Sequence, residues 1–150
     1  MRRRFPIPAA ALAVCLSAAA SAEPLPQLHL PRATLMLNGH AAEVQIAADE
    51  ASQNTGLMYR RRMPADEGML FVFGQTAVQC LWMRHTHLPL SAAFIREDGR
   101  IVSLHDMAPR TTRIHCSPEP VRYALEMHRG WFAAHGIGAG HAVQDLPAFR

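Results

Sequence analysis

Two pairs of strand-forming segments joined by turn residues predict β-hairpins. Residues 33–37 and 42–46 flank Asn38-Gly39, a pair that suits a tight turn because it accepts positive φ. Residues 92–104 repeat the arrangement around the turn Glu97-Asp98-Gly99. In each hairpin, alternate side chains are expected to face a core.

Further strands are predicted where apolar runs are too short to form helices. Residues 68–74 (GMLFVFG) form a glycine-bounded run rich in strand formers, which predicts a buried strand. The side-chain types of residues 78–83 alternate enough to predict another strand, with the even-numbered side chains on one face and the odd-numbered ones on the other. Residues 121–127 predict a strand or a short helix, and residues 142–143 predict a short final strand.

Helical signals occur at two places. Asp49 can cap a helix over residues 50–54 that ends near Gly56, and residues 129–136 suit a helix of one or two turns. Residues 106–120, rich in proline, threonine and charge, are expected to form a long loop. Many short strands, one or two short helices and frequent turns predict a mainly β single domain, a compact sandwich or barrel.

The first 22 residues have the pattern of a secretory signal peptide. Three arginines precede an apolar run over residues 9–16, and Ala20-Ser21-Ala22 follows, so cleavage is expected after Ala22. The run is well short of the ~20 residues that span a bilayer, and no transmembrane segment is expected. The mature chain would then comprise a loose lead-in, residues 23–32, and one domain, residues 33–146, that is periplasmic or secreted.

Charge narrows the class of partner. The chain has no lysine, and its formal net charge of +3 disappears with the signal peptide, because twelve arginines then face twelve acidic residues. A neutral exported domain favours small molecules, proteins or the cell envelope over polyanions. We therefore expect a small polar ligand or an envelope protein as the partner, and no nucleic acid.

Cys80 and Cys116 remain in the mature chain, whereas Cys15 would be lost with the signal peptide. In an oxidising compartment, paired cysteines tend to form a disulfide. Such a bridge would stabilise the fold by roughly 3–4 kcal/mol on the chain-entropy account. Their wide spacing favours a structural bridge, or two unpaired thiols, over a redox-active pair.

A series of short motifs runs through the chain in a fixed order. The series comprises Gly56-Leu57-Met58-Tyr59-Arg60, Gly68-Met69-Leu70-Phe71-Val72-Phe73, Trp82-Met83-Arg84-x-Thr86, Pro89-Leu90, Phe94-Ile95, Gly99-Arg100-Ile101-Val102, Pro109, Tyr123-Ala124-Leu125-Glu126 and Gly130-Trp131-Phe132-x-x-x-Gly136-Ile137-x-x-Gly140. Together these motifs resemble the domain of unknown function 192 family over about residues 33–144. The resemblance implies a mostly β, sandwich-like domain, often exported in bacteria, and it implies no reaction.

Three polar positions depart from the pattern of that family. His85 stands where the family commonly has Asn, Ser91 where it has Asp after Pro-Leu, and His141 where it has Asp after the last glycine. The resemblance therefore carries no role for that amide or for those carboxylates into this chain.

The segment of residues 80–90 (CLWMRHTHLPL) concentrates reactive side-chain types. Its first part, including Cys80, Trp82 and Met83, is interpreted as a buried strand with a polar end at residues 84–86. Glu126 lies in an apolar run, where a buried acid needs a cation or hydrogen-bond donors. It is expected to form a structural ion pair with an arginine, Arg60 or Arg84, or to contact a ligand. The candidate binding pocket comprises Arg60, Trp82, Arg84, His85, Thr86 and Glu126.

Two classes of function remain open from the sequence. The first is a noncatalytic binding or envelope accessory domain, in which an arginine fork would hold a carboxylate or phosphate. The second is an envelope enzyme, such as a metal-assisted hydrolase that uses His85 as base together with Glu126. The chain lacks a Gly-x-Ser-x-Gly motif, an HExxH motif and paired cysteine–histidine spacing. No catalytic residue, metal ligand or cofactor is therefore assigned.

Overall fold

The computed structural model describes residues 24–148, so the predicted signal peptide lies outside the described residues. In chain order the elements are β1 (Arg32–Leu37), β2 (His40–Ala47), α1 (Glu50–Thr55), β3 (Glu67–Ala77), β4 (Cys80–Leu81), β5 (Leu90–Ile95), β6 (Ile101–Met107), β7 (His115–Cys116), β8 (Val121–His128), α2 (Trp131–Ala134) and β9 (Val143–Gln144). The predicted fold class, mainly β with short helices, is confirmed. Within residues 24–148, no helix has the length and apolar character needed to cross a membrane.

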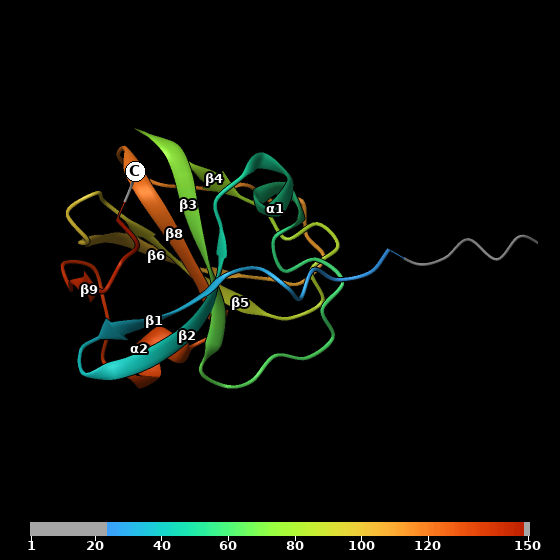
Figure 1. The fold of residues 1–150 in the computed structure, drawn as a ribbon, viewed down its shortest axis with the longest axis horizontal. Helices are drawn as coiled ribbons and strands as arrows, with labels where there is room; N and C mark the ends of the chain where they lie inside the picture. The colour runs from blue at the N-terminus through green and yellow to red at the C-terminus, as the bar shows by residue number, and fades with distance from the viewer. Residues whose placement is uncertain (1–23, 149–150) are drawn as a thin grey trace, which may run out of the picture.

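Seven strands form one sheet in the order β6-β5-β8-β3-β2-β1-β9, and this sheet curls into a half-barrel (Figure 1). Its central neighbours β2 and β3 are parallel, and the other pairs are antiparallel. Because a parallel pair needs a crossover connection, residues 48–66, which include α1, cross one face of the sheet. The short strands β4 and β7 pair only with each other.

A hydrophobic core fills each face of the sheet. On the face that carries α2, Trp131 and Phe132 pack with strand residues such as Leu125. The opposite face, which we call the α1 face, packs Leu57 of the crossover against strand residues such as Phe71. Successive side chains of β3 and β8 enter the two cores alternately, as the period of two along a strand requires.

Local sequence signals account for the confirmed hairpins and for α1. Asn38 and Gly39 have φ values of 48° and 79°, as the turn between β1 and β2 requires. The side chain of Asp49 accepts a hydrogen bond from the Ser52 backbone N–H, and the Ser52 side chain completes a capping box. Residues 121–127 form a strand rather than a helix, because β8 pairs with β3 on one side and with β5 on the other.

The strand predicted at residues 78–83 is much shorter than expected. Only Cys80 and Leu81 pair with another strand. Cys80 is exposed and Trp82 is 44% exposed, so the interpretation of both as buried was wrong. The reason is that β4 lies outside the main sheet, and in the segment that contains it the side chains of Leu81 and Met83 face the core.

The segment before β1 has no helix or strand, but hydrogen bonds attach it to the domain. The side-chain amide of Gln27 donates to the backbone oxygens of Ser52 and Gly56, at 2.8 Å each. The side chain of Gln45 on β2 donates to the backbone oxygen of Leu28 at 3.2 Å. This part of the lead-in therefore lies against α1 and β2.

Candidate functional site

Glu126 is a buried acid without a polar partner among the residues that the structure describes. On β8 it lies between Met69 of β3 and Ala92 of β5, and like them it faces the α1 face of the sheet. Its exposed fraction is 4%. Within residues 24–148, no group forms a hydrogen bond or an ion pair with its carboxyl group. The ion pair expected with Arg60 or Arg84 is therefore not formed.

Burial sets the protonation state of this carboxyl group. Removal from water disfavours the charged form and raises the pKa of Glu126 to about 8, with no contribution from a neighbouring charge. At neutral pH the group is therefore mainly protonated, and it can both donate and accept a hydrogen bond. A buried acid with a strongly shifted pKa is a common feature of functional sites when it also adjoins a cavity.

A cavity of about 230 Å³ adjoins Glu126. Its walls come from the C-terminal end of α1 and the turn that follows, from β3, and from the segment that contains β4. Glu126 is the one ionisable side chain among the described residues that line this cavity, since the sulfur of Cys80 is held in a disulfide. We call this space the Glu126 cavity.

The polar wall of the Glu126 cavity is held in place by α1. Gln53 and Asn54, both with side-chain amides, line this wall. The amide nitrogen of Gln53 donates to the backbone oxygens of Ala47 and Val72, at 3.3 and 2.8 Å. These two bonds fix the helix to β2 and β3, and Gly56, with φ 48°, ends it.

The apolar wall consists of aromatic side chains and a disulfide. Phe71 and Phe73 stack with ring centroids 6.4 Å apart, and both line the cavity together with Trp82. The disulfide between Cys80 and Cys116 joins β4 to β7, so one of the alternatives drawn from the sequence, a structural bridge, is present. This bridge holds the segment that carries Trp82 at the rim of the cavity.

Thr86, which lines the cavity, lies where three segments with left-handed residues meet. Tyr59, His85 and Arg110 all have left-handed backbone, with φ values of 65°, 56° and 56°. The backbone N–H of Tyr59 donates to the His85 carbonyl at 2.9 Å, and that of Arg110 donates to the Thr86 carbonyl at 3.0 Å. The rings of Tyr59 and His85 also stack, with centroids 5.4 Å apart. Such conformations persist where surrounding contacts hold them.

Arg84 and His85 do not line the Glu126 cavity. Both are exposed. The guanidinium group of Arg84 lies over the Trp82 ring, 5.6 Å from its centroid, and its Nε donates to Nε2 of His85 at 3.2 Å. The hydrolase hypothesis requires His85 and Glu126 to lie at one site. The structure does not bring His85 to the cavity that Glu126 lines.

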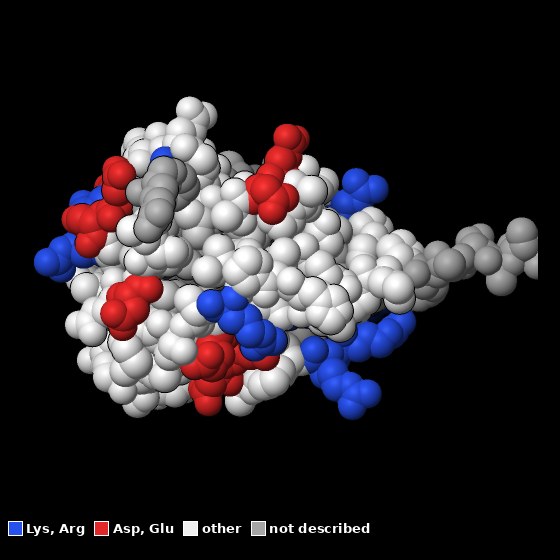
Figure 2. Space-filling view, in the orientation of Figure 1, with Lys and Arg blue, Asp and Glu red and all other residues white. Residues whose placement is uncertain are grey.

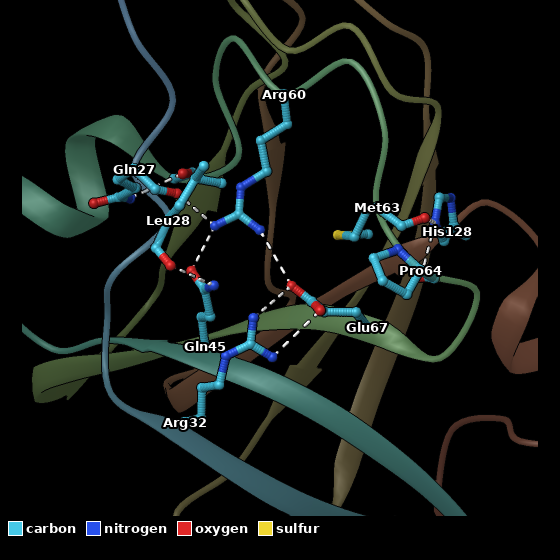
Figure 3. Close-up of polar contacts among 10 residues, drawn as sticks. Gln27, Leu28, Arg32, Gln45, Arg60, Met63, Pro64, Glu67 and His128 are labelled. Carbon is cyan, nitrogen blue, oxygen red and sulfur yellow. Dashed lines mark hydrogen bonds and ion pairs between the residues drawn. The ribbon is translucent and has the colours of Figure 1, made fainter.

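Arg60 belongs to a separate structural cluster (Figure 3). Its side chain, 3% exposed, donates to the side-chain oxygen of Gln45 at 2.5 Å and to the backbone oxygen of Gln27 at 2.7 Å. It also pairs with Glu67 at 3.6 Å, and Glu67 pairs with Arg32 at 3.1 Å. Arg60 therefore links the lead-in, β2 and β3, and it does not line the Glu126 cavity.

The histidines are not arranged as a metal site. No group of three or more His, Cys, Asp or Glu side chains within the described residues could hold a metal ion. His105 and His115 lie close together, with ring centroids 5.8 Å apart. His141 instead hydrogen-bonds through Nδ1 to the backbone of Gly138.

Three residues of the predicted pocket, Trp82, Thr86 and Glu126, line one cavity, and the other three lie elsewhere. Sequence reasoning missed the amide and phenylalanine side chains of this cavity. It missed them because periodicity does not reveal which face of a sheet a crossover helix covers. The one available signal was a polar pair ahead of Gly56, at the end of a well-capped helix. The missed residues are Gln53, Asn54, Phe71, Phe73 and Gln79.

Comparison with known proteins agrees with this fold. The family described as DUF192, Uncharacterized ACR, matches residues 33–144, and no curated protein matches the chain. A crystal structure from Sinorhizobium meliloti 1021, of a protein described as a candidate transcription regulator, is similar to it, with 36% identity and a TM-score of 0.76. That comparison covers 79% of this chain and 96% of the other.

A crystal structure of a protein of unknown function from Novosphingobium aromaticivorans DSM 12444 is also similar, with 27% identity and a TM-score of 0.75. It covers 81% of this chain and 94% of the other. The family match includes β2 to β9, all of β1 except Arg32, both helices and every residue named above as lining the Glu126 cavity. The chain belongs to the domain of unknown function 192 family.

Proposed function

We propose that the mature protein is an exported, noncatalytic domain that binds a small polar ligand in the Glu126 cavity. The observation that carries this proposal is the carboxyl group of Glu126, which is buried, lines a cavity and has no partner among residues 24–148. Buried polar groups in folded proteins are nearly always hydrogen-bonded. A group left unpaired beside an open space is therefore positioned to bind a molecule that enters that space.

Export is supported by the N-terminal sequence and by the disulfide. Residues 1–22 have the basic start, short apolar core and small-residue end of a cleaved signal peptide. The bridge between Cys80 and Cys116 is of a kind that persists in oxidising compartments and is rare in the cytosol.

A binding role is favoured over hydrolysis by the composition of the cavity wall. General acid–base catalysis needs titrating groups within reach of one reacting atom. Glu126 has no titrating companion among the described lining residues, and His85 lies outside the cavity. A bound molecule would therefore be held rather than be attacked by a paired acid and base.

The charge distribution supports a small ligand over nucleic acid. The mature chain is neutral, and acidic and basic side chains are interspersed over the face shown in Figure 2. Binding to a polyanion depends on a concentrated positive surface. The chain therefore offers no electrostatic support for a nucleic-acid partner.

Native mass spectrometry of the full chain, produced in a bacterial host with its own N-terminus, tests this proposal. We expect protein recovered from the periplasm to begin at Glu23, to show the mass of a disulfide, and to carry a small molecule that denaturation releases. The matched control is Glu126→Gln, which keeps the side-chain shape and is expected to lose the bound molecule.

Either of two results would contradict the proposal. An uncleaved chain retained in the cytosol would refute export. A wild-type protein that carries no small molecule, and whose cavity residues do not respond to an extract of periplasmic metabolites, would refute binding.

A further inference from the structure

We propose that the ligand is a small organic ammonium ion, whose cationic group pairs with Glu126 and whose apolar part lies against Phe71, Phe73 and Trp82. This inference rests on the proposed function, and it names the chemical class of the ligand.

The one ionisable group that the described part of the chain contributes to the cavity favours a cation over an anion. An ammonium ion in the cavity meets a carboxyl group that can ionise, whereas a carboxylate or phosphate meets no cation from the described lining residues. Two other ionisable groups of the α1 face, Arg60 and His128, are bound elsewhere (Figure 3). Arg60 pairs with Glu67, and Nε2 of His128 contacts the backbone oxygens of residues 63 and 64 at 2.9 and 3.2 Å.

The walls suit an organic cation better than a metal ion. Aromatic faces attract cations through their ring quadrupoles, and Trp82 already carries the guanidinium group of Arg84 against its ring. The lining also includes three neutral residues whose side chains carry hydrogen-bond acceptors, namely Gln53, Gln79 and Thr86. A metal ion would need several convergent charged or imidazole ligands, and the described residues offer no such group.

The volume limits the size of the ligand. An apolar protein cavity of ~150 Å³ accommodates a benzene ring. At about 230 Å³, the Glu126 cavity has room for one ring or short chain with a cationic arm. Folded partners and long peptides are too large to enter it.

Pairing with a cation couples binding to the release of a proton. Burial keeps the carboxyl group of Glu126 protonated below its pKa of about 8, and an adjacent cation favours the ionised form. Below pH 8 each ammonium ion therefore displaces up to one proton. Its affinity should rise by up to about tenfold per pH unit as the pH approaches 8, and then level off.

Three probes of matched shape and different charge test the inference: benzylammonium, benzyl alcohol and benzoate. Each is titrated into the mature, disulfide-bonded protein while chemical shifts of the backbone amides are followed at pH 7.5. We expect benzylammonium to shift residues of α1 and β4 and to bind at least about tenfold more tightly than the other two probes, since a charge-assisted pair is the stronger contact.

Two variants and one control make the outcome specific. Glu126→Gln should abolish the preference for benzylammonium. Trp82→Ala, at the exposed rim, should weaken benzylammonium several-fold without affecting the fold. Glu43→Gln removes an exposed acid and should leave all three affinities unchanged.

The failure of this inference can be distinguished from failure of the proposed function. If benzyl alcohol or benzoate binds in the cavity as tightly as benzylammonium, or if Glu126→Gln keeps the preference, the ammonium assignment is wrong while ligand binding stands. If no probe shifts the cavity residues, the ammonium assignment is wrong. Ligand binding then also fails if native mass spectrometry finds no bound molecule.

Discussion

Glu126 links the stability of this fold to pH. Because folding raises the pKa of its carboxyl group from 4.5 to about 8, the folded protein keeps a proton that the unfolded chain releases between those values. The stabilising contribution of the neutral acid is fully present below about pH 4.5. It is lost as the pH rises through about 8, where the buried group must ionise.

Replacing Glu126 with glutamine should remove this dependence. We expect Glu126→Gln to match the wild-type free energy of unfolding near pH 4.5 and to exceed it progressively at higher pH, by up to roughly 3–5 kcal/mol. Urea unfolding over a series of pH values measures the difference. A difference that stays constant with pH would show that Glu126 is not the responsible group, and Glu43→Gln is the control.

Two departures from the family pattern fit their surroundings, His85 through its backbone conformation and Ser91 through its hydrogen bonds. His85 has φ 56°, a conformation in which Asn and His are more frequent than most residues. The hydroxyl group of Ser91 donates to Asp106 at 2.5 Å and accepts from the Gly130 backbone N–H at 2.9 Å. In this chain, the Ser91 hydroxyl group therefore accepts from the residue that precedes α2, and the carboxylate of Asp106 holds that hydroxyl group in place.

The conformation of His85 gives a second residue-level prediction. His85→Asn should change the free energy of unfolding by less than about 0.5 kcal/mol, whereas His85→Val should cost about 1–2 kcal/mol, because a β-branched residue is strained at positive φ. Thermal unfolding of both variants measures this contrast. Equal costs would mean that the ring of His85, stacked on Tyr59, matters more than its backbone.

At the level of elements, β3 contains two glycines in very different surroundings. A Cβ atom at Gly68 would lie 2.3 Å from both the backbone oxygen of Glu126 and the sulfur of Met127, whereas one at Gly74 would have no atom within 4 Å. Gly68 therefore permits the close approach of β3 to the part of β8 that contains Glu126.

We expect Gly68→Ala to destabilise the protein by roughly 2–3 kcal/mol or more, because the backbone of β8 must move. Gly74→Ala, on the same strand, should be neutral or slightly stabilising, since it only reduces the freedom of the unfolded chain. Urea unfolding compares the two variants directly. Similar effects would argue against the tight β3–β8 contact.

Elements specified by neighbouring residues could be predicted from the sequence, and those specified by distant partners could not. The turn at Asn38-Gly39 and the cap at Asp49 are local signals, and both predictions are confirmed. Residues 121–127 are all buried, so no alternation distinguished a strand from a helix. The parallel pairing of β2 with β3 has no local signal, and this pairing brings α1 over Glu126.

At the scale of the whole molecule, one covalent bond joins two segments outside the main sheet. The disulfide between Cys80 and Cys116 closes a loop across 36 positions. Replacing both cysteines with serine should lower the free energy of unfolding by roughly 3–4 kcal/mol and weaken binding in the cavity, because β4 carries part of its wall. Urea unfolding with and without reductant checks the first effect, and an unchanged midpoint would contradict it.

The central pairing of the sheet also determines when the protein can fold. β3 pairs with β8, so that residue 69 meets residue 126. Translation proceeds from the N-terminus, and the middle of the sheet therefore cannot assemble until nearly the whole chain has left the ribosome. Pairing between such distant segments also slows folding. The leader proposed at residues 1–22 emerges first, at a stage when β8, which completes the centre of the sheet, has not yet been made.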